Sequence, residues 1–287
     1  MNFVFNREAV FRLLGILNSK FSFITSVFVA YPASEEYALA YVYPKHRHLM
    51  RWSPWPVGIF QQNGKWGVTF VISSTEPDFA VPDNADNLKR LVSKTEKIRL
   101  LLGAQQKTFA GILPGILFRK RLVRDVVEAN VTVMAVIKAE EAVRNIETFS
   151  SRVPIIILGS RGFIGRRLIS HLSDREVYGI DIEDNALCSW PDHLYGRDAV
   201  IINLTRKAAL NDYISKFWSS LILINEVYPE PLPSELTELA DQGCRGYHIV
   251  GVNARAYPPF PKAYRGGIPC CAARTTEGMA VMVRRII

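Results

Sequence analysis

The stretch IIILGSRGFIGRRLISHL, from Ile155 to Leu172, decides the fold that we expect for this chain. Four apolar residues run directly into three glycines at regular spacing, and an amphipathic segment follows them. A second apolar segment, EVYGIDI, ends near Asp181, about 20 residues further on. A strand, a glycine turn, a helix and a second strand in this order are typical of dinucleotide-binding units. The glycines let the backbone approach a pyrophosphate, and the helix N-terminus offers free N–H groups. The alternative is an ordinary glycine turn, with Asp181 capping a neighbouring helix.

The residues expected to bind the cofactor lie in this glycine loop and after the two strands that follow it. They are Gly159, Ser160, Arg161, Gly162, Phe163, Ile164, Gly165, Asp181, Leu204 and Thr205. Asp181 is placed to accept hydrogen bonds from the ribose hydroxyls of NAD, whereas the guanidinium of Arg161 is placed to pair with the 2′-phosphate of NADP. The choice between NAD and NADP therefore stays open.

The composition is that of a globular chain with enough apolar residues for a sizeable core. The 287 residues are 48% hydrophobic and 22% charged, with a net charge of +8. The positive charge is dispersed along the chain, so we expect no nucleic-acid partner. The longest apolar stretch falls short of the ~20 residues that a membrane helix needs, and the four cysteines lack zinc-type spacing. We expect a cytoplasmic protein with no integral membrane span and no metal. The sequence leaves a homo-oligomer open.

Two domains are expected, with a boundary near Ser151. Residues 1–150 predict an α+β domain that ends in a long linking helix over 125–149. Residues 151–287 predict a Rossmann-type domain, with a doubly wound parallel sheet, because short apolar runs alternate there with helical stretches. A final helix over 275–287 is expected to return to the first domain. Within the first domain we expect a helix over 1–17, strands over 22–31 and 37–43, a hairpin over 56–73 turning at Asn63-Gly64, and a helix over 83–102 that stops at Gly103.

This order of parts resembles the shikimate-dehydrogenase-like group of NAD(P)-dependent oxidoreductases. Within that group, four short segments are similar to the long-chain acyl-[acyl-carrier-protein] reductases. The segments are GAQQKTFAGILPGIL, VEANVTVMAVIKAEEAV, LILINEVYPEPL and IPCCAARTTEGMAVMVRR. The resemblance implies that Gly111, Asn130, Thr132 and Tyr228 line a substrate pocket in the cleft between the domains.

The resemblance also implies a cysteine nucleophile that attacks an acyl thioester. Cys271 is the expected nucleophile and Cys270 the alternative. The attacking species is a thiolate, so the thiol pKa must be lowered, and the helix expected after the cysteines would do so with its N-terminus. The competing interpretation is that both cysteines are buried as small hydrophobic residues.

His248 lies in the alternating segment RGYHIVGV and could act as a general acid near the nicotinamide. We favour the alternative, a hydrogen-bonded residue of a strand.

Three functions are compatible with these patterns. The first is an NAD(P)H-dependent reductase that converts a small or carrier-bound acyl thioester to an aldehyde through a cysteine acyl-enzyme. The second is an NAD(P)-dependent dehydrogenase or reductase of a small carbonyl, imine or amino-acid-derived metabolite, without covalent catalysis. The third is a non-enzymatic nucleotide-sensing or partner-binding protein, since a fold alone does not assign a function.

Overall fold

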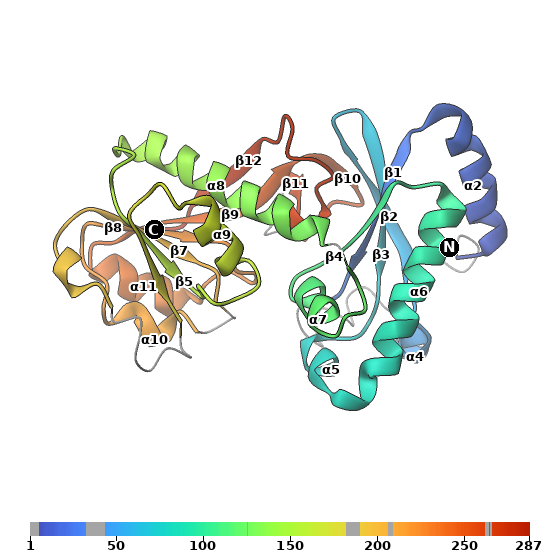
Figure 1. Cartoon of the computed structure of the whole chain (residues 1–287), viewed down its shortest axis with the longest axis horizontal. Coiled ribbons are helices and arrows are strands. Elements are labelled where there is room, and N and C mark those ends of the chain that lie inside the picture. Colours follow the sequence, from blue (N-terminus) through green and yellow to red (C-terminus); the bar gives the residue numbers. More distant parts are fainter. Residues whose placement is uncertain are drawn as a thin grey trace. The chain divides into compact units, whose positions relative to one another are not determined.

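The computed structural model describes residues 6–32, 44–124, 126–181, 190–205, 209–261, 264 and 266–287 (Figure 1). It contains two compact units. Unit 1 comprises Met1–Val131 and Val252–Gly278, and unit 2 comprises Thr132–Gly251 and Met279–Ile287. The units therefore divide within the long helix α8 (Val127–Glu147), and not near Ser151. The strand predicted over 37–43 lies outside the described residues.

Unit 1 is built on a five-stranded mixed sheet with the strand order β10-β2-β3-β1-β4. The strands are β1 (Ile24–Ala30), β2 (Trp55–Gln62), β3 (Lys65–Val71), β4 (Gln106–Phe109) and β10 (Arg255–Tyr257). β1 runs parallel to β3 and β4, whereas β2 is antiparallel to β3 and β10. The β2–β3 hairpin turns at Asn63 and Gly64, whose φ angles of 50° and 74° are those of the predicted turn.

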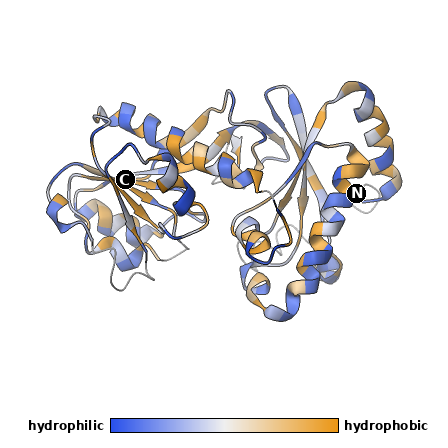
Figure 2. Ribbon diagram, in the orientation of Figure 1, coloured by the Kyte–Doolittle hydropathy of each residue, from blue (hydrophilic) through white to orange (hydrophobic). Residues whose placement is uncertain are grey.

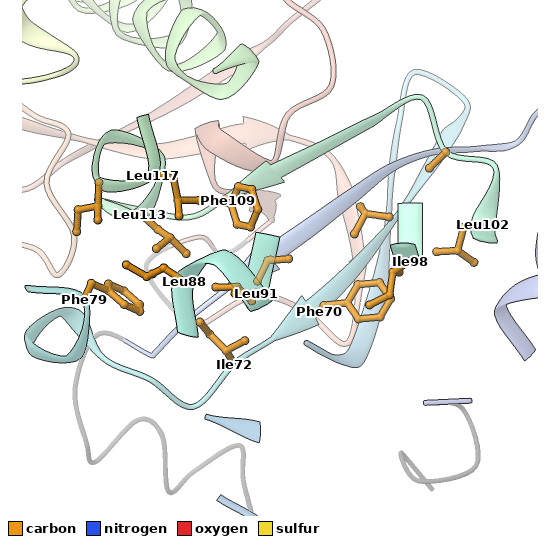
Figure 3. Close-up of a cluster of buried hydrophobic side chains, with 14 of the residues drawn as sticks. Phe70, Ile72, Phe79, Leu88, Leu91, Ile98, Leu102, Phe109, Leu113 and Leu117 are labelled. Atoms are coloured by element: carbon orange, nitrogen blue, oxygen red, sulfur yellow. The ribbon is translucent and has the colours of Figure 1, made fainter. Parts of the chain in front are cut away.

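Helices cover this sheet and form the unit 1 core with it. They are α2 (Glu8–Phe21), α4 (Arg47–Met50), α5 (Glu76–Ala80), α6 (Ala85–Leu102) and α7 (Leu113–Arg119), with 3₁₀ turns at Pro44–His46 and Pro82–Asn84. Figure 3 shows side chains of α6 and α7 packing with Phe70, Ile72 and Phe79 in one apolar cluster. As predicted, α6 ends at Gly103, which adopts φ 63°.

Unit 2 contains five parallel strands of a seven-stranded sheet, in the order β9-β8-β7-β5-β6. The strands are β5 (Ile155–Leu158), β6 (Val177–Ile180), β7 (Ala199–Asn203), β8 (Leu221–Asn225) and β9 (Arg245–Asn253). The helices of this unit are α9 (Gly165–His171), α10 (Asn211–Ile214) and α11 (Pro233–Asp241), together with most of α8 and a 3₁₀ turn at Asp192–Leu194. Every residue of β5, β7 and β8 is buried, and Figure 2 shows these strands as predominantly hydrophobic. The predicted α/β class and Rossmann-type parallel sheet are confirmed.

The expected C-terminal helix is wrong. Residues Val281–Arg285 form a strand, β12, that pairs with β9. The final residue, Ile287, lies against Gly246 of β9, where an added Cβ would stand 2.7 Å from the Ile287 side chain. β-Branched residues at alternate positions of VMVRRII favour a strand, and the contact with β9 decides the outcome.

The end of β9 extends beyond unit 2. The last two residues of β9, Val252 and Asn253, belong to unit 1 and pair with β11 (Gly267–Ile268). Within the described residues, no helix combines the length and apolarity that crossing a bilayer requires.

Candidate functional site

The glycine loop leaves β5 at the point where the strand order of the unit 2 sheet reverses. β6 pairs with one side of β5 and β7 with the other. The sheet therefore extends to one side of β5 through β6 and to the other side through β7. The loops after β5 and β7 leave from neighbouring strand ends at this position. In open α/β sheets, ligands bind at the carboxyl ends of the strands at such a position.

The three glycines are required by the close approach of the loop to itself and to its neighbour. Gly159 adopts φ 83°, and a Cβ there would lie 2.8 Å from the Leu204 carbonyl oxygen after β7. A Cβ on Gly162 would lie 2.9 Å from the Gly159 carbonyl oxygen, and one on Gly165 would overlap that same oxygen. Any larger residue at Gly165 must therefore displace the backbone of the loop.

The backbone N–H groups of the loop fall into two sets. Those of Gly159 and Ser160 donate to the Ile180 carbonyl oxygen at 2.9 and 3.1 Å, and that of Gly162 donates to Gly159 at 3.0 Å. The backbone N–H of Ile164 has no acceptor among the described residues. The first half of the loop thus closes the turn, and the second half retains a donor for an anion.

Asp181 forms a hydrogen bond with the glycine loop. Its Oδ2 accepts the backbone N–H of Arg161 at 2.9 Å. The exposed Arg161 is accompanied by two further cations: Arg166 Nε donates to the Arg161 carbonyl at 2.7 Å, and the guanidinium of Arg167 lies 4.0 Å from the Phe163 ring centre. The loop therefore carries three arginines beside the Asp181 carboxylate.

A buried polar ladder crosses β7, β8 and β9 at the level where β7 and β8 end. Asn203, Asn225 and His248 are at most 2% exposed and stand in register on adjacent strands. Asn203 Nδ2 donates to Asn225 Oδ1 at 2.8 Å, and Asn225 Nδ2 lies 3.0 Å from His248 Nδ1. Thr205 donates to Asn203 Oδ1 through both its backbone N–H and its hydroxyl, at 3.2 and 2.6 Å. The ladder thus reaches Thr205, one of the predicted cofactor residues.

Sequence reasoning missed the two asparagines of this ladder. The available signal was an asparagine closing each of two apolar runs, AVIIN and LILIN. His248 lies in a strand, as favoured, and burial lowers its pKa to about 4.

Two glutamates follow β8 and were also missed. Burial raises the pKa of the Glu226 carboxyl to about 7, and its backbone N–H donates to the Asn203 carbonyl at 3.1 Å. Glu230 Oε1 lies 3.9 Å from His248 Nε2 and 2.5 Å from Arg284 Nη2 on β12. A carboxyl group with a near-neutral pKa is suited to exchange a proton at physiological pH.

The cysteines do not precede a helix. Cys270–Ala272 is a short 3₁₀ turn, followed by irregular chain. The helix N-terminus that was expected to lower the thiol pKa is absent from this part of the structure. Cys270 is buried at 8% exposure, as the hydrophobic interpretation expected, and Cys271 is half-buried.

The residues expected to line a substrate pocket have different environments. Gly111 adopts φ 54° and lies against the Tyr31 hydroxyl, which donates to Glu76 at 2.8 Å and accepts the Ile112 N–H at 3.0 Å. On α8, Asn130 is exposed and Thr132 is buried, because residues two apart on a helix face different directions.

Tyr228, the fourth pocket residue, is half-buried. It lies beyond the end of β8, three residues after Asn225 of the polar ladder.

Comparisons with known proteins found similar solved structures at low sequence identity. No protein-family model matches the sequence, and no curated protein matches it. L-tryptophan dehydrogenase from Nostoc punctiforme is similar at 15% identity and a TM-score of 0.36, over 78% of this chain and 69% of that one. A shikimate dehydrogenase in complex with NADP+ is similar at 14% identity and a TM-score of 0.44, over 78% of this chain and 84% of that one. The hetero-hexameric glutamate dehydrogenase from Thermus thermophilus is similar at 10% identity and a TM-score of 0.42, over 78% of this chain and 63% of that one.

All three TM-scores are below 0.5, so these similarities assign no activity to the chain. None of the three structures is an acyl-carrier-protein reductase, and closeness to that family stays a prediction.

Proposed function

We propose that the chain is an NAD(P)-dependent dehydrogenase or reductase of a small carbonyl, imine or amino-acid-derived substrate. The observation that carries this proposal is the glycine loop after β5. It combines three sterically required glycines, a backbone N–H at Ile164 with no acceptor in the described part of the chain, and a carboxylate at Asp181 on the switch point of a parallel sheet. These are the features that a Rossmann unit needs to hold a pyrophosphate and a ribose.

The residues divide the binding task between them. The Ile164 N–H would face the pyrophosphate, with the neighbouring arginines balancing its charge. Asp181 would accept hydrogen bonds from the adenosine ribose, and Arg161 would pair with a 2′-phosphate where one is present. The bound nicotinamide supplies or accepts the hydride.

Reduction of a C=O or C=N bond also needs one proton on the oxygen or nitrogen. Glu226 follows β8 directly and has a pKa of about 7, so it holds a transferable proton over the pH range in which many enzymes work. We propose it as the proton donor. Covalent catalysis by Cys271 is not part of this proposal, because the helix on which it depended is replaced by a loop and a strand.

The test is a substitution that disturbs only the loop. In Gly165→Ala, the added methyl overlaps the Gly159 carbonyl oxygen, so the loop must open and the affinity for NADH and NADPH should fall at least ~100-fold, a loss of about 3 kcal/mol. Isothermal titration calorimetry against both dinucleotides measures this change.

Gly196→Ala is the matched control in the same unit. Gly196 is an exposed glycine with φ 77° and open space around it. Its substitution should cost about 1 kcal/mol of stability and leave dinucleotide affinity unchanged. A wild-type protein that binds neither dinucleotide would overturn the proposed function. Binding without turnover of a panel of carbonyls and imines would instead favour a nucleotide sensor.

A further inference from the structure

The polar ladder fixes which nitrogen of His248 carries its proton. A backbone N–H can only donate, so the Thr205 N–H identifies the facing atom of Asn203 as the oxygen. Asn203 must then donate to the oxygen of Asn225. The nitrogen of Asn225 consequently donates both to the Val227 carbonyl at 2.8 Å and to His248 Nδ1. Nδ1 is therefore an acceptor, and the proton of the neutral ring sits on Nε2.

The Nε2–H of His248 lacks an acceptor among the described residues. The side chain is 1% exposed, and the Glu230 Oε1 atom is 3.9 Å away, which is too long for a hydrogen bond. Arg284 Nη2 pairs with the same carboxylate oxygen at 2.5 Å. A buried donor without an acceptor costs free energy, and it therefore favours a ligand that supplies one.

The position of this pair within the sheet indicates what the ligand is. Asp181 is expected to bind the adenosine ribose, so the adenosine would lie on the β5–β6 side of the switch point. The β7–β9 side would then face the other end of the dinucleotide. His248 is level with the last residues of β7 and β8 on that side. Burial keeps its pKa near 4, so the ring is uncharged at neutral pH.

We propose that His248 and Glu230 together bind the primary carboxamide of the nicotinamide ring. This inference rests on the proposed function. The Nε2–H donates to the carboxamide oxygen, and Glu230 accepts from the carboxamide NH₂. Glu230 is 27% exposed, so the ligand enters from its side, and the glutamate turns aside to admit it. A donor beside an acceptor is complementary to an amide and not to a carboxylate.

Ligand discrimination tests the pair without any need for a substrate. Calorimetry compares three ligands: the oxidised dinucleotide that the wild type prefers, its nicotinic acid analogue, and the matching ADP-ribose fragment, with the 2′-phosphate if NADP is preferred. The carboxamide form should bind at least ~10-fold more tightly than the acid form, which places a carboxylate against Glu230. Glu230→Gln should narrow that difference to within ~3-fold.

A matched pair of variants tests His248. The side-chain nitrogen of His248→Gln reaches the Nε2 position, whereas that of His248→Asn reaches only the Nδ1 position. His248→Gln should keep the higher affinity for the carboxamide dinucleotide than for ADP-ribose. His248→Asn should reduce that affinity difference ~10-fold while leaving the affinity for ADP-ribose unchanged. ¹⁵N NMR of the histidine ring should show Nε2 protonated in the wild type.

The outcomes separate this inference from the proposed function. A wild type that binds ADP-ribose but does not distinguish amide from acid overturns the carboxamide assignment alone. Equal losses for ADP-ribose and dinucleotide in His248→Asn make the residue structural and overturn the assignment too, as does a proton on Nδ1. A wild type that binds none of the three ligands overturns the proposed function and the assignment with it.

Discussion

Asp181 and Arg161 place opposite charges at the same end of the expected cofactor site. The Asp181 carboxylate uses one oxygen to accept the Arg161 N–H and retains acceptor capacity for a ribose hydroxyl. The same negative charge opposes a 2′-phosphate, which the Arg161 guanidinium favours. We therefore expect the balance of these two side chains to set the preference between NAD and NADP.

Asp181→Asn should move the preference toward NADP. The amide oxygen of asparagine still accepts the Arg161 N–H, so the loop keeps its shape while the charge is removed. We expect the ratio of the NADPH and NADH dissociation constants to shift ~10-fold toward NADPH. Arg161→Gln should shift it by a similar factor in the other direction, with both ratios measured by fluorescence titration. Equal changes in both affinities would show that the two residues do not contact the 2′ position.

At the scale of elements, the buried ion pair Glu140–Arg144 links the end of α8 to residues 150–153, which lead into β5. Glu140 and Arg144 are 1% and 5% exposed and pair directly on α8. Arg144 also donates to the carbonyls of Ser150 and Val153 at 2.5 and 2.8 Å, and Arg175 reaches Glu140 at 3.0 Å. The pair thus sets where the peptide chain turns from helix to strand.

Arg144→Leu should destabilise unit 2 by about 3 kcal/mol, because it leaves a buried carboxylate with only Arg175 as partner. The double variant Glu140→Leu/Arg144→Leu should recover part of this loss, since it removes the unpaired charge. Urea denaturation measures both variants. A single variant within 1 kcal/mol of the wild type would show that the pair contributes little to the junction.

Sequence alone predicted the elements whose signals are local. The Asn63-Gly64 turn, the stop of α6 at Gly103 and the glycine turn after β5 each depend on a backbone conformation that few residues adopt. β12 was missed because its pattern VMVRR fits a helix as well as a strand, and pairing with β9 decides between them. The polar ladder was missed because its bonds join residues 22 and 23 positions apart, so it exists only once the strand order is known.

At the scale of the whole molecule, each unit contains a buried titratable group whose pKa is displaced toward its neutral form. In unit 2, burial lowers the pKa of His248 from 6.5 to about 4. In unit 1, burial raises the pKa of Glu128 from 4.5 to about 7, although its Oε1 accepts the Phe109 N–H at 3.1 Å. Unit 2 also contains Glu226, whose pKa burial raises from 4.5 to about 7, so its response to pH opposes that of His248.

The stability of the two units should therefore respond differently to pH between about 4.5 and 6.5. As the pH falls, unfolded His248 takes up a proton that the folded ring does not bind, which costs unit 2 up to about 3 kcal/mol by pH 4. Folded Glu226 already holds its proton in this range, which returns a similar free energy, so the stability of unit 2 should stay nearly constant. As the pH rises, unfolded Glu128 releases a proton that the folded carboxyl retains until about pH 7, so unit 1 loses a similar amount. Hydrogen exchange measures both slopes separately, using the core amides of β1 for unit 1 and of β7 for unit 2. Glu128→Gln should flatten the slope of unit 1. His248→Gln should leave unit 2 with the response of Glu226, so that it loses stability as the pH rises, and Glu226→Gln should leave it with the opposite response of His248. A unit 1 slope that persists in Glu128→Gln, or a unit 2 slope that neither of its variants changes, would contradict these assignments.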